Sequence, residues 1–355
     1  MRIRLISLVI FTIAIACQTK TTITFEEIKG DWFFDTVYYA NSNVLKPPSQ
    51  PFNNKQGYTF KNDKKLLFHP GFYSVDSIGQ IHFFGDETTF NLKEDSLIFF
   101  DPITSSWRRK SVKISKDSLW LGGNGKIEKY IRQNLPLTDT LKFDEIILSS
   151  SECFGFCIPM DILINKNGNT LLAKDSGNSR IFVKTILQKD RLQRLWRDFS
   201  KANLSSIDSS YVSGTSDLQT IYLSFTNHTQ IIKSIKDYGL ASPTFIVWAY
   251  WNLLNMEMDS SIEWKHIDIN FQLPSIIVLI KGDRKLRLSK SESFFLQSEI
   301  LKGIKVNQQK SIKTPIMTKD GKIKTDGRFF TFEQKNKKIT IDIGYNFIEN
   351  NRFLK

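Results

Sequence analysis

Two cysteines separated by three residues carry the most evident chemical potential in this sequence. They lie in the segment Cys153-Phe154-Gly155-Phe156-Cys157-Ile158-Pro159. A disulfide needs its two Cα atoms about 4.4–6.8 Å apart, and a loop centred on glycine can curl that tightly. Closing so short a loop removes little chain entropy, roughly 2 kcal/mol, so the bond would shape the loop more than it would stabilise a domain. We therefore expect a structural disulfide between Cys153 and Cys157.

Two other chemistries stay open for this pair. A thiol-based redox protein or another enzyme centred on Cys153 and Cys157 is the first alternative, although the spacing is not Cys-x-x-Cys. Metal binding is the second, but it needs further ligands, and the four histidines are not clustered: His69, His82, His228 and His266. Hydrolase and dinucleotide-binding motifs are absent from the sequence. We expect no catalytic residue, no metal and no cofactor.

The third cysteine, Cys17, follows an apolar run that resembles the signal peptide of bacterial lipoproteins. A short basic region precedes Leu5–Ala16, which is too short to span a bilayer stably. The run ends Ala14-Ile15-Ala16-Cys17, similar to a lipobox. The resemblance implies cleavage before Cys17 and acylation of this residue, with palmitate as an expected group, which gives a stable membrane anchor. An ordinary secretory peptide is the alternative.

Lipidation would account for the odd number of cysteines. It leaves Cys153 and Cys157 as an even pair in an oxidising compartment, where disulfides persist. We expect residues 1–17 to be the signal peptide with its lipobox cysteine and residues 18–24 to be a polar tether. The expected location is the cell envelope, at the outer membrane, on its periplasmic or its surface-exposed side.

The chain is strongly basic, with a formal net charge of +13. Its basic groups are scattered over expected hairpins, for example Lys61–Lys65, Arg108–Lys110 and Lys335–Lys338. This distribution is typical of solvated strand faces and edges. Because no stretch combines stacked aromatic residues with arginines as a single-strand groove requires, we expect no nucleic acid partner.

Residues 25–133 are expected to form an all-β barrel. Short runs with a period of two are separated by turn signals, and about eight such strands suit a closed up-and-down barrel. The runs are Tyr58–Phe60, Leu66–Phe68, Gln80–Phe84, Thr88–Leu92, Ser96–Phe100, Trp107–Ile114, Ser118–Leu121 and Lys126–Ile131. Gly30-Asp31-Trp32 resembles the opening motif of lipocalin-like barrels, which implies that Trp32 plugs the closed end. Trp32, Trp107 and Tyr130 are candidates to line a cavity, or they are ordinary core.

After a linker at residues 134–142, residues 143–265 indicate an α+β domain with antiparallel hairpins. Asn167-Gly168 is a strong hairpin signal. Leu192, Leu195, Trp196 and Phe199 follow helical spacing. A second helix is expected to start with Ser242 as N-cap and Pro243 at the first helical position. Its body, Phe245–Leu254, is apolar on nearly all sides and should be buried against a sheet.

Residues 143–265 resemble a domain family of unknown function common in Bacteroidetes lipoproteins. The resemblance is carried by a Cys-Phe-Gly-x-Cys-Pro signature, here with Ile158 inserted before Pro159. Two later features complete the pattern. One is Tyr211 followed by Ser216-Asp217, and the other is the strand end Lys233-x-x-x-Asp237-Tyr238. The pattern singles out Tyr211, Asp217 and Asp237 as candidates for a small binding site, with turn and capping contacts as the alternative. Phe154 and Phe156, which flank Gly155, are candidates for a partner surface.

Residues 266–355 repeat a hairpin and helix pattern, as a separate α+β segment or as part of the preceding domain. Ser289 to Glu292 form a capping box before a helix at Phe294–Leu301. A degenerate duplication within residues 143–355 is one reading, and coincidence is the other.

Three functions follow from these patterns. The first is a non-enzymatic envelope lipoprotein that binds a small apolar ligand or an envelope protein. The second is the enzyme centred on the cysteine pair. The third is a structural or assembly lipoprotein.

Overall fold

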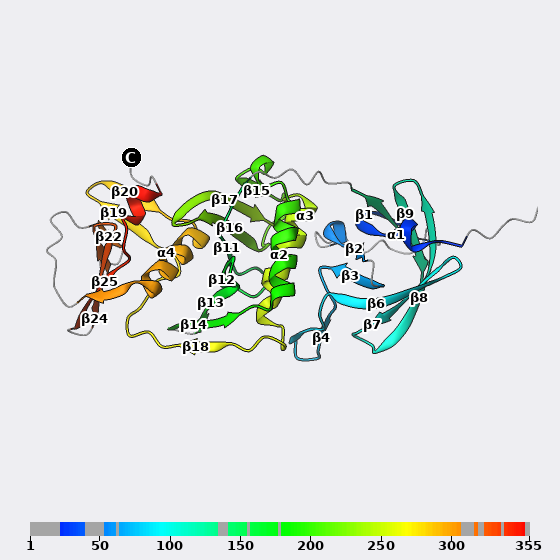
Figure 1. Cartoon of the computed structure of the whole chain (residues 1–355), viewed down its shortest axis with the longest axis horizontal. Coiled ribbons are helices and arrows are strands. Elements are labelled where there is room, and N and C mark those ends of the chain that lie inside the picture. Colours follow the sequence, from blue (N-terminus) through cyan, green and yellow to red (C-terminus); the bar gives the residue numbers. More distant parts are fainter. Residues whose placement is uncertain are drawn as a thin grey trace, which may run out of the picture.

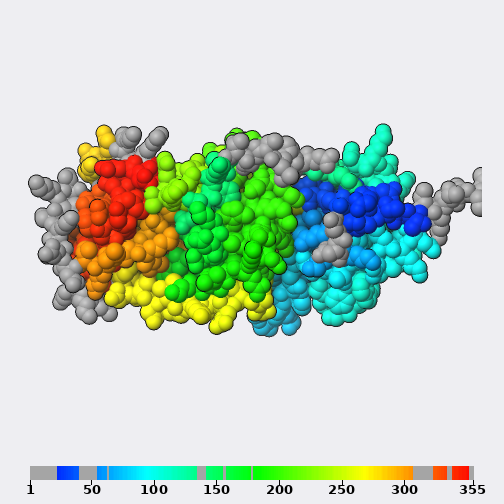
Figure 2. Space-filling view, viewed as in Figure 1, coloured from blue at the N-terminus to red at the C-terminus, as the bar shows by residue number. Residues whose placement is uncertain are grey.

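The computed structural model describes residues 22–39, 53–61, 64–133, 141–154, 157–176, 179–306, 316–318, 323–334 and 337–351. Cys17, the signal peptide, Phe156 and most of the expected linker lie outside these residues. Three parts lie in a row: a β-barrel, a middle sheet with helices on both faces, and a C-terminal sheet (Figure 1). Figure 2 shows them as successive bands of one elongated molecule. The expected fold class, a β-barrel followed by a mixed α and β part, is confirmed.

The barrel closes in the strand order β1-β10-β9-β8-β7-β6-β3-β2. Its strands are β1 (Gly30–Tyr39), β2 (Gly57–Phe60), β3 (Lys65–His69), β6 (Glu87–Lys93), β7 (Ser96–Asp101), β8 (Ser106–Ser115), β9 (Ser118–Gly123) and β10 (Lys126–Arg132). A strand is present within Gln80–Phe84, but the prediction that it belongs to the barrel was wrong. Because β3 pairs directly with β6, β5 (Ile81–Phe83) pairs instead with β4 (Tyr73–Val75) in a separate two-stranded sheet.

Trp32 belongs to the buried core of the barrel. This side chain is fully buried, and its Nε1 donates a 2.6 Å hydrogen bond to the carbonyl oxygen of Ile28 in the short helix α1 (Phe25–Ile28). The guanidinium of Arg132 lies 4.5 Å from the centre of the indole. Tyr130 is also inside, whereas Trp107 is 54% exposed, so the expectation that Trp107 faces the interior was wrong. Trp107 lies on the outward side of β8, where it meets Phe100 edge-on.

The middle sheet has the strand order β15-β17-β16-β11-β12-β13-β14-β18, and β15 is parallel to its neighbour. Helices α2 (Lys189–Lys201) and α3 (Thr244–Leu254) cover one face. The strands are β11 (Glu145–Ser150), β12 (Asp161–Asn165), β13 (Asn169–Ser176), β14 (Ser179–Ile186), β15 (Ser210–Val212), β16 (Thr220–Asn227), β17 (Gln230–Tyr238) and β18 (Lys265–Ile267). Two 3₁₀ turns, η2 (Leu204–Ser206) and η3 (Asn255–Glu257), follow α2 and α3.

Helix α3 begins one residue later than expected. Pro243 is the N-cap, and the Ser242 hydroxyl donates to the Asp237 carboxylate instead of capping the helix. The interaction with Asp237 takes the side chain away from the helix amides. The helix is buried on nearly all sides, as its composition predicted.

The C-terminal part shares a core with the middle sheet. Helix α4 (Lys290–Lys302) packs on the face of the sheet opposite α2 and α3, where Phe294 and Phe295 join Ile147 and Leu163. The expected capping box of Ser289 is confirmed. The C-terminal strands are β19 (Val278–Lys281), β20 (Arg284–Arg287), β21 (Ile304–Val306), β22 (Ile316–Thr318), β23 (Ile323–Thr325), β24 (Phe329–Gln334) and β25 (Lys337–Asp342), followed by α5 (Phe347–Asn350). In the described part of the chain, no helix is long and apolar enough to cross a membrane.

The barrel and the middle part meet at Trp248 of α3. Its indole is stacked between two rings of the barrel wall, Phe33 at 4.2 Å and His69 at 3.9 Å between ring centres. The indole Nε1 donates a 2.6 Å hydrogen bond to the carbonyl oxygen of Lys55, in the turn η1 (Asn53–Lys55). At Gly57 the ring lies so close to the backbone that an added Cβ would overlap it. We call this contact region the joint.

Polar contacts surround the stacked rings. Lys201 of α2 pairs with Asp31 of β1 at 2.8 Å, and Arg194 of α2 makes a two-pronged contact with Asp86. The Asn255 amide donates a 3.0 Å hydrogen bond to the carbonyl oxygen of Pro70. Together these contacts join α2 and the turn η3 to β1 and to the barrel segments next to β3 and β6.

Replacement of Trp248 by alanine tests the joint. The change removes a buried ring with two stacking partners, so we expect the free energy of unfolding to fall by about 3–5 kcal/mol in urea denaturation. Trp107→Ala is the matched control, because that ring is half exposed, and it should cost less than about 1 kcal/mol. Similar losses in both variants would contradict the packing described.

Candidate functional site

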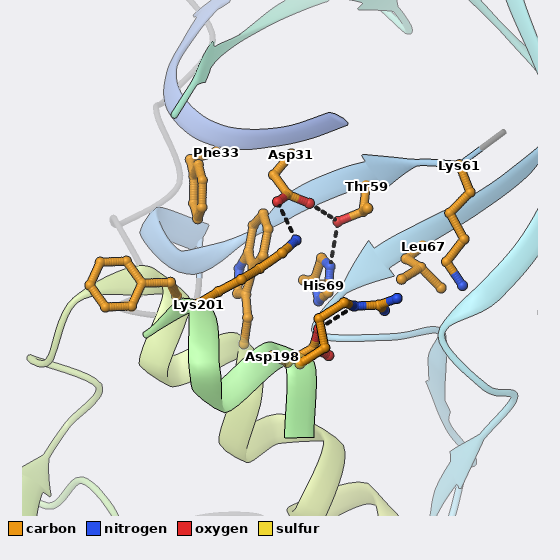
Figure 3. A pocket seen from close by; sticks show the side chains of 11 residues that line it. Asp31, Phe33, Thr59, Lys61, Leu67, His69, Asp198 and Lys201 are labelled. Atoms are coloured by element: carbon orange, nitrogen blue, oxygen red, sulfur yellow. Dashed lines mark hydrogen bonds and ion pairs between the residues drawn. The ribbon is translucent and has the colours of Figure 1, made fainter. Parts of the chain in front are cut away.

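A pocket of about 200 Å³ lies in the joint, beside the stacked Trp248 ring (Figure 3). Barrel strands β1, β2 and β3 contribute one wall, and helices α2 and α3 contribute the other. The lining residues are Asp31, Phe33, Thr59, Lys61, Leu67, His69, Arg197, Asp198, Lys201, Phe245 and Trp248. Pockets at domain interfaces are frequent ligand sites, which makes this one the candidate functional site.

The apolar part of the pocket comes from outward-facing barrel residues and from Phe245 and Trp248 of α3. In β1 to β3, Trp32, Tyr58 and Leu66 belong to the barrel core, so their neighbours Phe33 and Leu67 point to the opposite side. An outward-facing barrel residue is usually polar. Here the outward-facing Phe33 of β1 and Leu67 of β3 are apolar, because the helix pair covers the outer wall.

A chain of hydrogen bonds crosses the floor of the pocket. The Thr59 hydroxyl donates to Asp31 at 2.8 Å and lies 3.1 Å from Nε2 of His69 (Figure 3). Lys201 Nζ donates to the other oxygen of Asp31 at 2.8 Å. Burial alone would raise the pKa of Asp31, but the charge and hydrogen bond of Lys201, with help from Thr59, lower it. Asp31 is therefore an ionised carboxylate with its oxygens already in use.

His69 is a buried, neutral imidazole. Burial and the nearby Arg194 guanidinium lower the pKa of His69 from 6.5 to about 3. The Asp31 carboxylate opposes this effect, whereas the charges of Lys201 and Lys61 reinforce it. The ring is stacked on Trp248, so it serves packing as well as the hydrogen-bond chain.

Charged residues of α2 form the edge of the pocket. Asp198 accepts a 3.1 Å hydrogen bond from the Asn252 amide and lies 3.6 Å from Nε of Arg197. Burial raises the pKa of Asp198, against the opposing charges of Arg194 and Arg197. On the barrel side, Lys61 Nζ pairs with Glu87 at 3.0 Å.

This arrangement is suited to binding more than to bond breaking. A general base needs an accessible lone pair near the proton that it takes. His69 is buried with Nε2 engaged by Thr59, and Asp31 is engaged by Thr59 and Lys201. Within the described residues, no three His, Cys, Asp or Glu side chains are grouped so that they could hold a metal ion.

The cysteine pair lies elsewhere and does not line the pocket. Cys153 and Cys157 form the expected disulfide, with their Cα atoms 5.7 Å apart. The amide of Phe154 donates a 3.0 Å hydrogen bond to the carbonyl oxygen of Asp217, which joins the loop to the segment before β16. The side chain of Phe154 is 92% exposed, and Phe156 lies outside the described residues.

The other residues singled out by the sequence have structural contacts. The Tyr211 hydroxyl accepts a 2.9 Å hydrogen bond from the amide of Asp208, and Asp217 adopts a left-handed φ of 61°. Asp237 is buried and accepts hydrogen bonds from the amides of Ala241 and Ser242 and, at 2.8 Å, from the Tyr250 hydroxyl. Asp237 thereby holds the start of α3, the helix that carries Trp248.

Sequence reasoning missed the pocket residues. The available signal was the failure of alternation in β1 and β3, where Trp32-Phe33-Phe34 and Leu66-Leu67-Phe68 are apolar on both faces. Such runs indicate strands covered on both sides. The partner helix is distant in the chain, so the pattern alone could not identify it.

The depressed pKa of His69 predicts a pH dependence of stability. The unfolded chain takes up a proton near pH 6.5 and the folded chain only near pH 3, so stability is lost as the pH falls through this window. Between pH 6.5 and pH 5, wild type should lose about 2 kcal/mol more than His69→Phe, which keeps a ring on Trp248. His228→Phe, at an exposed histidine, is the control and should follow wild type. Parallel curves for wild type and His69→Phe in urea denaturation would refute the prediction.

A family model described as Domain of unknown function (DUF6438) matches residues 144–257. No curated protein and no solved structure matches the chain. The matched segment contains helices α2 and α3 and, except for β18, all strands of the middle sheet. The domain of unknown function expected at residues 143–265 agrees with this match in position, and the matched segment follows the eight-stranded barrel.

Proposed function

We propose that this protein is a cell-envelope lipoprotein that binds a small, largely apolar ligand without chemical conversion. The pocket at the joint is the binding site. The observation that carries the proposal is the apolar wall of Phe33, Leu67 and Phe245 beside the edge of Trp248, within a cavity bordered by charged side chains. An apolar wall with a few placed polar groups is the usual composition of a ligand site.

The size of the pocket limits the ligand. At about 200 Å³ it is smaller than the pockets that hold drug-sized molecules, so the ligand is a compact group such as a single ring or a short branched chain. The interior of the barrel is a less suitable site. Large side chains such as Trp32, Tyr58, Phe60 and Tyr130 are buried there and pack against one another.

The envelope location rests on the sequence. The lipobox resemblance ends at Cys17, outside the described residues, and the described chain begins next to the barrel. A short tether would therefore hold the barrel nearest to the membrane and the C-terminal sheet farthest from it.

A second candidate function is the binding of an envelope protein at the cysteine loop. Phe154 is the most exposed large apolar side chain among those of the described residues, and the disulfide and the Asp217 contact hold its backbone in place. A fixed, exposed aromatic residue suits a protein contact. The Cys-Phe-Gly-x-Cys-Pro signature of the domain family would then mark a docking loop.

Ligand binding is tested with an uncharged apolar probe. Benzyl alcohol should bind the mature wild-type chain in the millimolar range, as measured by saturation-transfer NMR. Leu67→Phe fills the pocket and should weaken binding at least about tenfold, with circular dichroism to verify folding. Ile78→Phe, at an exposed position, is the control and should bind like wild type. An absence of binding to wild type, or equal binding to Leu67→Phe, would overturn the proposal.

Lipidation is tested separately at Cys17. In cells fed with labelled palmitate, the wild-type protein should incorporate label and sediment with membranes, because acyl chains anchor it. Cys17→Ser should do neither. The double variant Cys153→Ser/Cys157→Ser keeps Cys17 and should be labelled like wild type. Label retained by Cys17→Ser would contradict the lipoprotein assignment.

A further inference from the structure

We propose that the pocket at the joint selects ligands in which a small apolar body carries one anionic group, such as a carboxylate. This inference rests on the proposed function and specifies the ligand class. The apolar body would lie against Leu67 and Phe245, and the anionic group would lie at the edge, between the cationic side chains of α2 and the barrel.

The cations reach the pocket from both walls. Lys201 and Arg197 come from α2, and Lys61 follows barrel strand β2. Figure 3 shows Lys61 and Lys201 on opposite sides of His69. A ligand anion at the edge of the pocket would therefore have cationic side chains on both walls.

The carboxylates that line the pocket are already neutralised by protein groups. Asp31 pairs with Lys201 at 2.8 Å and accepts from Thr59. Asp198 is hydrogen-bonded to Asn252 and lies 3.7 Å from Nε of Arg194. A ligand cation would have to compete with these contacts. A ligand anion would have to share Lys201 with Asp31 and Lys61 with Glu87, whereas Arg197 makes no hydrogen bond as short as these to Asp198.

Arg197 is the residue best placed to hold the anion. Its side chain is 52% exposed, and its Nε approaches Asp198 at 3.6 Å, which is longer than a hydrogen bond. A guanidinium has five N–H donors in a planar fork that fits the two oxygens of a carboxylate. Because Arg194 and Asn252 also contact Asp198, Arg197 can turn toward a ligand without leaving that carboxylate buried alone.

The electrostatic environment of His69 agrees with this assignment. Burial is the largest cause of the lowered pKa of His69; the charges of Arg194, Lys201 and Lys61 add to it, and Asp31 opposes it. The floor of the pocket is thus unfavourable for an added positive charge. The charge part of this effect, from Arg194, Lys201 and Lys61, would attract a negative group, which is best placed at the solvent-exposed edge because burial disfavours any charge.

The inference is tested with three probes of the same shape and different charge. Benzoate is anionic, benzamide is neutral and benzamidine is cationic at pH 7. We expect benzoate to bind the mature wild-type chain about tenfold more tightly than benzamide in saturation-transfer NMR, and benzamidine to bind most weakly. Equal binding of benzoate and benzamide, or tighter binding of benzamidine, would overturn the inference and leave the proposed function intact. Failure of all three probes to bind would overturn both.

A pair of variants on one helix locates the anion contact. Arg197→Gln should reduce the preference for benzoate over benzamide to about threefold or less and leave benzamide binding unchanged. Arg191→Gln is the matched control, because Arg191 pairs with Asp259 and does not line this pocket. A preference for benzoate that survives Arg197→Gln unchanged, or that falls equally in Arg191→Gln, would contradict the assignment of Arg197.

Discussion

The stacking of Trp248 between Phe33 and His69 is the interaction on which the arrangement of this molecule depends. It places one ring of the middle part between two rings of the barrel wall, above a glycine where a larger residue would not fit. The polar contacts of the joint lie around this stack and fix the orientation of the helices relative to the barrel. On the far side of α3, the buried Asp237 fixes the start of the helix, so the position of Trp248 is determined from both parts.

The pocket is a consequence of how two curved surfaces meet. A barrel wall and a pair of helices touch closely at Trp248 and separate beside it, which leaves a space lined by the residues that would otherwise be covered. The same geometry explains its chemistry. Burial keeps His69 neutral, and Asp31 is paired with Lys201 and Thr59. The charged ends of Lys61 and Arg197 lie at the solvent-exposed edge of the pocket. An apolar interior with a cationic edge is what a small amphipathic anion requires.

Much of the fold could be predicted from local patterns, and the joint could not. Period-two runs identified most barrel strands, and the spacing of Leu192 to Phe199 identified α2, because both signals lie within one element. The run at Gln80–Phe84 looked the same but lies outside the barrel, since pairing is decided by distant strands. Gly57 and Trp248 meet only through the tertiary fold, so no local pattern connects them. The cysteine motif was conspicuous in the sequence, yet its disulfide shapes a loop away from the pocket.

A double-mutant cycle between Phe33 and Trp248 tests the central claim most directly. Urea denaturation of wild type, Phe33→Ala, Trp248→Ala and the double variant gives the coupling free energy between the two rings. If the rings stack across the joint, the coupling should be about 1 kcal/mol or more. A coupling of zero within error would show that the two residues do not interact, and would contradict the joint and the pocket beside it.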